Sequence, residues 1–247
     1  MSILSTNARG ESLTTASAMT AITGYPFSYS FMVKRGQVSA SRCLWMWEDS
    51  GGTEFLEFMT REATSDSTHN GWRHEQNTSG FTNLYDDAGL IDVWERITVC
   101  KDAVNSLTTW TALGTYTNTD SKAIAGGANG LDTIYIGGKS VATNEFGFPA
   151  YLADIAIWPG TQLVEADHTL LESYWASTIP KVPTYNWRGA SDLTNTLGGI
   201  DLKEAGVGIS HTIASGDNPS LTNYAVNGPL LVGGNIILGP NGGILTA

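Results

Sequence analysis

Paired carboxylates are the first candidates for chemistry in this sequence, because hydrolysis of a glycosidic bond uses two of them. In a retaining enzyme one acid protonates the leaving oxygen while the other attacks the sugar, with the two carboxyl groups about 5–5.5 Å apart. Residues of one strand share a face when they are two positions apart. Glu54 and Glu57 are three apart and Glu48 and Asp49 are adjacent, so neither pair shares a face of one strand. The sequence therefore predicts no catalytic residue.

Other catalytic and metal-binding motifs are absent from the sequence. It contains no Gly-x-Ser-x-Gly nucleophile turn, no His-Glu-x-x-His zinc motif and no Gly-x-x-x-x-Gly-Lys phosphate loop. Asp86 and Asp87 lie in a predicted turn, where a solvated turn and a calcium site are both open, although the regular spacing of a calcium loop is missing. The two cysteines, Cys43 and Cys100, could form at most one bridge, and two buried thiols are the alternative. We expect no metal and no cofactor.

Tryptophan residues are better candidates for ligand binding, because stacking on a sugar ring needs an exposed, flat, apolar surface. Trp45 and Trp47 are two positions apart and would share one face of a strand. Trp72 and His74 could present a second platform in the polar stretch 64–80, which we interpret as a long loop or an irregular hairpin. We take these four residues as the predicted ligand-binding residues. Tryptophan in a two-sheet protein also serves as core, so that alternative stays open for them.

Composition limits the class of protein that holds these residues. The chain has 247 residues and a formal net charge of −11, which argues against a protein that coats nucleic acid or an anionic membrane. It has 28 glycines and only 15% charged residues, a combination that favours strands and turns over helices. The first 24 residues lack the pattern of a signal peptide, and no apolar stretch approaches the roughly 18 residues of a membrane-spanning helix. We therefore expect a chain that is made in the cytoplasm of a cell and is neither exported nor inserted into a membrane.

Alternation of apolar and polar residues predicts many short strands. The segments with the clearest pattern are 26–34, 54–59, 94–101, 131–138 and 151–158. Segment 42–48 is instead apolar on both faces, which predicts a strand that is buried on both sides. Only 163–176 has helical spacing, with Glu165 and Asp167 in the first turn, where the helix dipole favours acids. The predicted fold is all-β, a two-sheet antiparallel jelly-roll sandwich with one short helix and a β-rich C-terminal extension.

Several of these segments follow one another in an order and spacing typical of one fold family. They are Pro26–Lys34, Trp94–Val99, Ile134–Gly138 and Tyr151–Trp158, the last followed by Leu163–Asp167. Together they resemble the concanavalin A-like, laminin G-like jelly roll over about residues 12–178, and the strand that runs into a short turn and helix is the most specific part. The resemblance implies two curved antiparallel sheets and a candidate glycan-facing surface. It implies no substrate, because the superfamily includes lectins, hydrolases and purely structural modules.

The chain divides into three predicted segments. Residues 1–23 are an N-terminal arm or first edge strand, 24–178 the jelly roll, and 179–247 a charge-poor β tail for packing or assembly. Within 205–247 the only charged residue is Asp217, and glycines separate short apolar pieces. Such strands lack the charged residues that normally protect sheet edges. Disorder, packing on the jelly roll and assembly with other chains are all open for this tail.

The resulting functional prediction is a non-enzymatic structural protein of a viral particle. We expect a phage decoration, fibre or tail component that displays the lectin-like jelly roll and is located in the virion. Its expected partners are other virion proteins and further copies of itself, with a surface glycan as candidate ligand and no nucleic acid. The alternative is a soluble carbohydrate-binding module or a divergent glycoside hydrolase of the same superfamily.

Overall fold

The computed structural model describes a large part of the chain. The described residues are 2–5, 12–35, 42–48, 55–62, 70–76, 81–83, 92–103, 106–112, 114–118, 130–136, 150–188, 193–205, 212–214, 219–224, 230–232, 235–237 and 244–245. Among them, no helix combines the length and the apolar character needed to cross a membrane.

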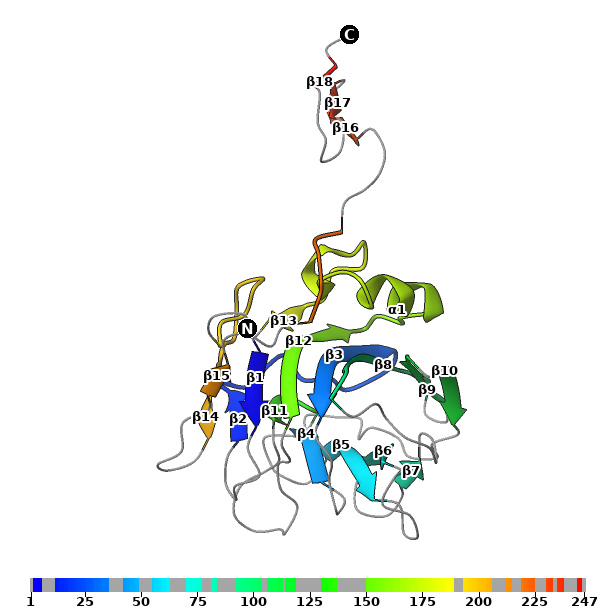
Figure 1. Cartoon of the computed structure of the whole chain (residues 1–247), viewed down its shortest axis with the longest axis vertical. Helices are drawn as coiled ribbons and strands as arrows, with labels where there is room; N and C mark the ends of the chain where they lie inside the picture. Colours follow the sequence, from blue (N-terminus) through cyan, green and yellow to red (C-terminus); the bar gives the residue numbers. More distant parts are fainter. Residues whose placement is uncertain are drawn as a thin grey trace.

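Two antiparallel sheets form the body of the protein, as the strand pattern predicts (Figure 1). Sheet A contains, in spatial order, β10 (Gly114–Asn118), β9 (Ser106–Thr111), β8 (Trp94–Ala103), β3 (Phe27–Arg35), β12 (Ala150–Pro159), β1 (Ser2–Ser5) and β15 (Thr212–Ala214), with β13 (Tyr185–Trp187) paired to β12. Sheet B contains β14 (Leu202–Ala205), β2 (Ser12–Thr15), β11 (Thr133–Ile136), β4 (Arg42–Glu48), β5 (Phe55–Glu62), β6 (Asn70–Gln76) and β7 (Phe81–Asn83). The all-β sandwich prediction is therefore confirmed.

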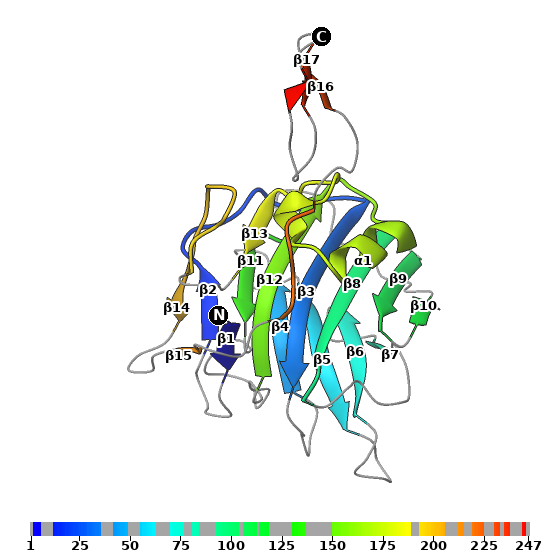
Figure 2. The same cartoon turned by 45° about the horizontal axis from the view of Figure 1, so that its top comes forward.

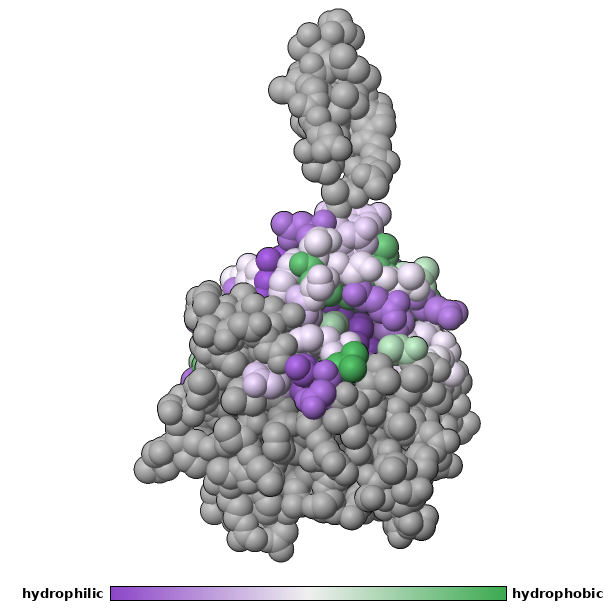
Figure 3. Space-filling model, viewed as in Figure 1, coloured by the Kyte–Doolittle hydropathy of each residue, from purple (hydrophilic) through white to green (hydrophobic). Residues whose placement is uncertain are grey.

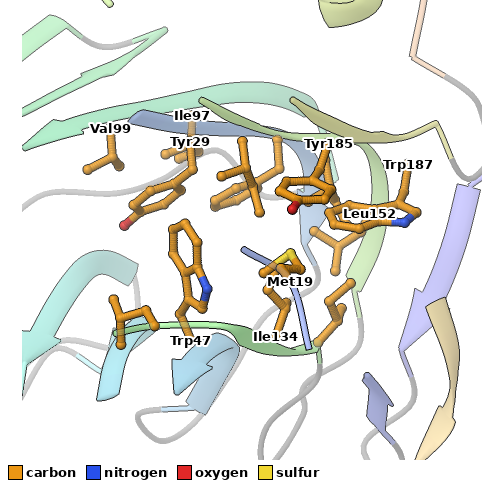
Figure 4. Close-up of a cluster of buried hydrophobic side chains, with 14 of the residues drawn as sticks. Met19, Tyr29, Trp47, Ile97, Val99, Ile134, Leu152, Tyr185 and Trp187 are labelled. Atoms are coloured by element: carbon orange, nitrogen blue, oxygen red, sulfur yellow. The ribbon is translucent and has the colours of Figure 1, made fainter. Parts of the chain in front are cut away.

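The main core lies between the two sheets. Alternate residues of β3 point into it, and Phe27, Tyr29, Phe31 and Val33 are at most 1% exposed. From sheet B, Trp47 packs its ring edge-on against Phe27 and Tyr29, at centroid distances of 5.8 and 6.3 Å (Figure 4). Edge-to-face pairs at this spacing add about 0.5–1.5 kcal/mol each beyond the area that they bury.

A second, smaller core covers the other face of sheet A. Helix α1 (Glu165–Leu171) and the 3-10 turn η1 (Ala176–Thr178) lie over β3, β8 and β12 (Figure 2). Their buried residues pack with Ala156 and Trp158 of β12, and this cluster also includes Leu163, Leu171, Ala176 and Ile179. We call this face of sheet A the helix-covered face.

The helix is shorter than the predicted segment 163–176. Its first turn is stabilised as expected, because the Asp167 carboxylate accepts a hydrogen bond of 2.8 Å from the N–H of Val164. After Leu171 the chain turns back, and the N–H of Ala176 donates to a buried carboxylate of β12 at 2.9 Å instead of continuing a helix. A tertiary hydrogen bond thus ends the helical pattern.

Both ends of the chain contribute strands to the sandwich. β1 lies between β12 and β15, and β2 lies between β11 and β14, so the N-terminal segment supplies an interior strand to each sheet rather than the expected arm or edge strand. The reason is that β14 and β15, from the predicted tail, cover the edges that β1 and β2 would otherwise leave open. The two-sheet body therefore extends past residue 178.

The rest of the tail forms a sheet of its own. β16 (Leu230–Val232), β17 (Asn235–Ile237) and β18 (Ile244–Leu245) make a three-stranded antiparallel sheet. Within the described part of the chain, these strands pair only with each other and are drawn apart from the sandwich (Figure 1). Packing on the jelly roll thus applies to β13–β15, and the role of β16–β18 remains a prediction.

Candidate functional site

The predicted ligand-binding residues all lie in sheet B. Trp45 and Trp47 are in β4, whereas Trp72 and His74 are in β6, which forms a hairpin with β5 and so replaces the long loop that was one interpretation of 64–80. The register connects them, because Trp45 pairs with Phe58 and Phe58 pairs with His74. Trp45, Trp47, Trp72 and His74 therefore occupy positions on the same face of the sheet.

The burial of Trp47 shows that this face of sheet B points to the main core. The Trp47 side chain is 0% exposed and packs in the main core, so it is no platform for a sugar and the core alternative holds for this residue. Trp47 is the only residue in β4 to β7 whose side chain is described. For Trp45, Trp72 and His74 the structure gives strand positions alone, and these positions share the inward-facing side of Trp47.

The opposite, outer face of sheet B carries a continuous row of residues in register. Pairing runs from β14 to β7 through Lys203, Thr14, Tyr135, Met46, Glu57, Glu75 and Phe81. The side is fixed by β11, where Tyr135 is partly exposed and its neighbours Ile134 and Ile136 are buried in the core. Lys203 at one end is exposed, whereas Thr14 between Lys203 and Tyr135 is buried, at 8% exposure. We call these seven residues the transverse row.

Two acids of the transverse row are direct partners. Glu57 of β5 and Glu75 of β6 are opposite each other in the antiparallel pairing. Directly opposed residues of such a pair have Cβ atoms about 4.5–5.5 Å apart. The comparison of acids within single strands missed this pair, because it forms only when the β5–β6 hairpin sets the register. Asp49, Glu54, Asp86 and Asp87 lie outside the described residues.

The helix-covered face of sheet A holds a buried ion pair. The Arg96 guanidinium contacts the Asp154 carboxylate at 2.7 Å, and their side chains are 1% and 0% exposed. Asp154 lies at a bulge in β12 with φ of 48°, and its carboxylate also accepts hydrogen bonds from the Asn186 amide and the N–H of Ala176. Burial lowers the pKa of Arg96, and the neighbouring Asp154 opposes that shift. Both oxygens of the Asp154 carboxylate thus accept hydrogen bonds, and these bonds connect β12 to β13 and η1.

His168 of α1 lies on the same face and is 5% exposed. Its Nδ1 shares a hydrogen bond of 3.0 Å with the Thr98 hydroxyl, and its ring stacks on Trp110 at a centroid distance of 6.5 Å. Burial, together with the positive charge of Arg96, lowers the pKa of His168 to about 4. The imidazole is therefore neutral near pH 7, and it acts as a packed polar side chain.

The thiol of Cys100 has a structural role rather than a catalytic one. Cys100 is a free, buried thiol, and burial raises its pKa, which disfavours the reactive thiolate. Within the described residues, no group of three or more His, Cys, Asp or Glu side chains is placed to hold a metal ion.

Comparisons with known proteins identify the fold. No protein-family model matches the chain. No curated protein sequence matches it. Among solved structures, a candidate carbohydrate-binding protein from Bacteroides ovatus aligns with a TM-score of 0.58 and 10% identity, over 89% of this chain and 61% of that chain. A native heptameric SAP-like pentraxin from Limulus polyphemus aligns with a TM-score of 0.51 and 10% identity, over 68% of this chain and 77% of that chain. The chain thus has the concanavalin A-like jelly-roll fold, as the resemblance of its strand segments implies.

Proposed function

We propose that this protein is a non-enzymatic, lectin-like structural component of a viral particle, and that the outer face of sheet B contacts glycans. The observation that carries the glycan-binding part is the transverse row. It places two aromatic residues, two acids and a lysine in one line across all seven strands of sheet B. Sugar recognition needs this combination, an apolar ring for the C–H face and charged groups for the hydroxyls.

Tyr135 is the described centre of this surface. It is partly exposed between two buried isoleucines, so its ring lies at the surface of the sheet rather than in the core. Carboxylates are strong acceptors for sugar hydroxyls, and Glu57 and Glu75 stand two and three strands away from it along the row. The predicted platform of Trp72 and His74 is on the other side of the same sheet, and we assign those residues no ligand.

A glycan array with four purified proteins, the wild type and three variants, tests this assignment. Wild-type protein should bind a subset of glycans. Tyr135→Ala and Glu57→Gln should each weaken that binding about tenfold, which corresponds to a loss of about 1.4 kcal/mol of binding free energy. Trp72→Phe should leave the binding unchanged. Loss of binding in Trp72→Phe with unchanged binding in Tyr135→Ala would move the site back to the original platform and contradict our assignment.

The virion role is supported by the charge-poor tail. β16–β18 contain no charged residue, and at 3, 3 and 2 residues these strands are at or below the short end of the usual range, so the sheet buries little apolar surface by itself. Other virion proteins or further copies of this chain would provide further packing. Mass spectrometry and electron microscopy of purified particles test the location, and absence of the chain from every particle fraction would refute it.

A second candidate function is hydrolysis of a glycosidic bond, and the pairing of Glu57 with Glu75 favours it specifically. The Cβ spacing of opposed residues is comparable to the carboxyl separation of about 5–5.5 Å in retaining glycosidases. Incubation with a panel of oligosaccharides, followed by product analysis, separates the two functions. Turnover that disappears in both Glu57→Gln and Glu75→Gln would establish the hydrolase and remove the non-enzymatic proposal, whereas binding without turnover supports the lectin-like role.

A further inference from the structure

Three side chains form a second row, on the helix-covered face of sheet A. Lys34 of β3 pairs in register with Trp94 of β8 on one side and with Tyr151 of β12 on the other. All three are partly exposed. Their neighbours Val33 and Leu152 are 1% and 2% exposed and point to the main core, so the three lie on the outward side of the sheet. We call them the Trp94 row.

The rings and the ammonium group of this row are close together. The ring centroids of Trp94 and Tyr151 are 6.5 Å apart, with an angle of 55° between the ring planes. The Nζ atom of Lys34 lies 5.9 Å from the centroid of the Tyr151 ring, within the range of a cation–π contact. The lysine is thereby held beside two aromatic rings rather than extended away from the sheet.

The Trp94 row lies next to a row of the same strands that is buried under the end of α1. The next row along the same strands, Arg96, Met32 and Ala153, is at most 5% exposed. Arg96 is covered there by the end of the helix, since its Nε donates to the carbonyl of Leu171 at 2.9 Å. The Glu172 side chain, 43% exposed, follows this carbonyl and acts electrostatically on Arg96. The Trp94 row is thus a partly exposed aromatic shelf, one row along the strands from the residues that the end of α1 covers.

The chemistry of this shelf fits a sugar. Partly exposed aromatic rings accept the apolar C–H face of a pyranose, and the Lys34 ammonium offers a hydrogen-bond donor for its hydroxyls. A protein partner is a poorer match, because stable interfaces bury about 800 Å² on each side, and hydrophobic residues form only small patches on the coloured part of the face shown in Figure 3. A net charge of −11 disfavours polyanionic ligands.

We propose that the Trp94 row is a binding site for a neutral pyranose residue of a glycan. This inference goes beyond the proposed function, because it places a second sugar site on the opposite sheet from the transverse row and does not depend on that row. With both sites occupied, one chain would hold two sugars on opposite faces of the sandwich.

The indole N–H of Trp94 provides a direct test in ¹H–¹⁵N spectra of the full chain. Its signal is assigned by its disappearance in Trp94→Phe. Cellohexaose and mannohexaose serve as neutral probes, and hexagalacturonate as the acidic probe, each titrated to millimolar concentration. We expect a neutral hexasaccharide to shift this signal, and Tyr151→Ala to weaken that binding about tenfold, the effect of losing about 1.4 kcal/mol.

Matched variants separate the outcomes. Trp175 is also a partly exposed tryptophan, and the guanidinium carbon of Arg188 lies 4.9 Å from the centroid of its ring. The control variant Trp175→Ala should leave the affinity unchanged. Tyr135→Ala should also leave it unchanged, so failure of the transverse row and failure of the Trp94 row are distinguishable.

If Tyr151→Ala unfolds, Lys34→Gln is the second test, with an expected loss of several-fold in affinity. No shift of the Trp94 signal with either neutral probe, a shift with hexagalacturonate alone, or an equal loss in Trp175→Ala would overturn the proposal.

Discussion

At the scale of single residues, polar side chains organise the helix-covered face of sheet A. Asp154 has a positive φ, a conformation that Asp and Asn adopt more readily than most residues, and this places its carboxylate beneath η1. From there it meets Arg96 of β8 and Asn186 of β13. A buried charge pair of this kind adds little stability over an apolar pair, but removal of one partner is costly, because the other is left as an uncompensated buried charge.

We therefore predict that Asp154→Asn destabilises the protein by about 3–5 kcal/mol. Asparagine keeps the size and tolerates the positive φ, so the loss reports the missing charge beside Arg96 together with the one acceptor oxygen that the amide group replaces. Urea denaturation followed by circular dichroism measures it. Asp92→Asn is the matched control, since Asp92 also has a positive φ, of 57°, but is exposed, and its effect should stay within about 0.5 kcal/mol. Equal effects of the two substitutions would contradict the role of the buried pair.

His168 gives a second prediction, for the pH dependence of stability. Its pKa is about 4 in the folded protein, against an ordinary value of 6.5, so the unfolded chain binds the proton more tightly. Its contribution to stability is complete above pH 6.5 and is lost as the pH falls toward 4, to a maximum of about 3 kcal/mol. The charged groups that face the imidazole are Arg96 from β8 and Glu172 after α1.

The measurement compares wild type with His168→Gln in urea denaturation between pH 7 and pH 4. We expect the difference in unfolding free energy between the two proteins to shrink as the pH falls. The reason is that His168 of the wild type takes up a proton in the unfolded chain at a higher pH than in the folded protein, whereas glutamine takes up no proton in either state. A difference that stays constant over this range would show that His168 does not titrate with the lowered pKa.

At the scale of elements, register decides which residues of sheet B meet ligand and which meet the core. The apolar residues on both faces of 42–48 predict strand β4 with its observed bounds, yet the sequence leaves open which face of the sheet Trp45 and Trp47 occupy. The burial of Trp47 fixes one face as inward, and pairing carries that assignment across β5 to β6. Hairpin pairing also brings together Glu57 and Glu75, which are 18 positions apart in the sequence.

Two substitutions in β6 test this register. Trp72→Ala should lower stability by about 3–5 kcal/mol, as expected for truncation of an inward-facing tryptophan. Glu75→Gln should instead raise stability by about 0.2–1 kcal/mol, because directly opposed like charges are destabilising and the substitution removes one of them. Thermal unfolding of both variants measures the effects. A neutral Trp72→Ala together with a destabilising Glu75→Gln would show that the two faces are the reverse of our assignment.

At the scale of the whole molecule, the sandwich is closed by strands from both ends of the chain. β1 and β2 from the N-terminus and β13, β14 and β15 from the C-terminal region complete the two sheets. A boundary drawn at residue 178 from composition would cut through this body. The loss of charged residues after residue 205 instead precedes β16–β18, which pair with each other within the described residues.

We predict that removal of residues 225–247 leaves the jelly roll folded and reduces self-association. The reason is that the strands that complete sheets A and B all precede this point, whereas the removed strands are uncharged and short. Sedimentation velocity at several concentrations compares the full chain with the truncated chain. A full chain that stays monomeric at high concentration, or a truncated chain that associates equally well, would exclude assembly through β16–β18.

The sequence alone determined the fold class and most strands of this protein, because alternation of apolar and polar residues is a local pattern that burial on one face of a sheet imposes. Only the tertiary structure decided what those strands carry on each face. The pairing of Glu57 with Glu75, the row of Trp94, Lys34 and Tyr151, and the end of α1 at Leu171 depend on which strands become neighbours and in what register. Such neighbours are set by packing between distant segments, and no pattern within a single segment contains that information.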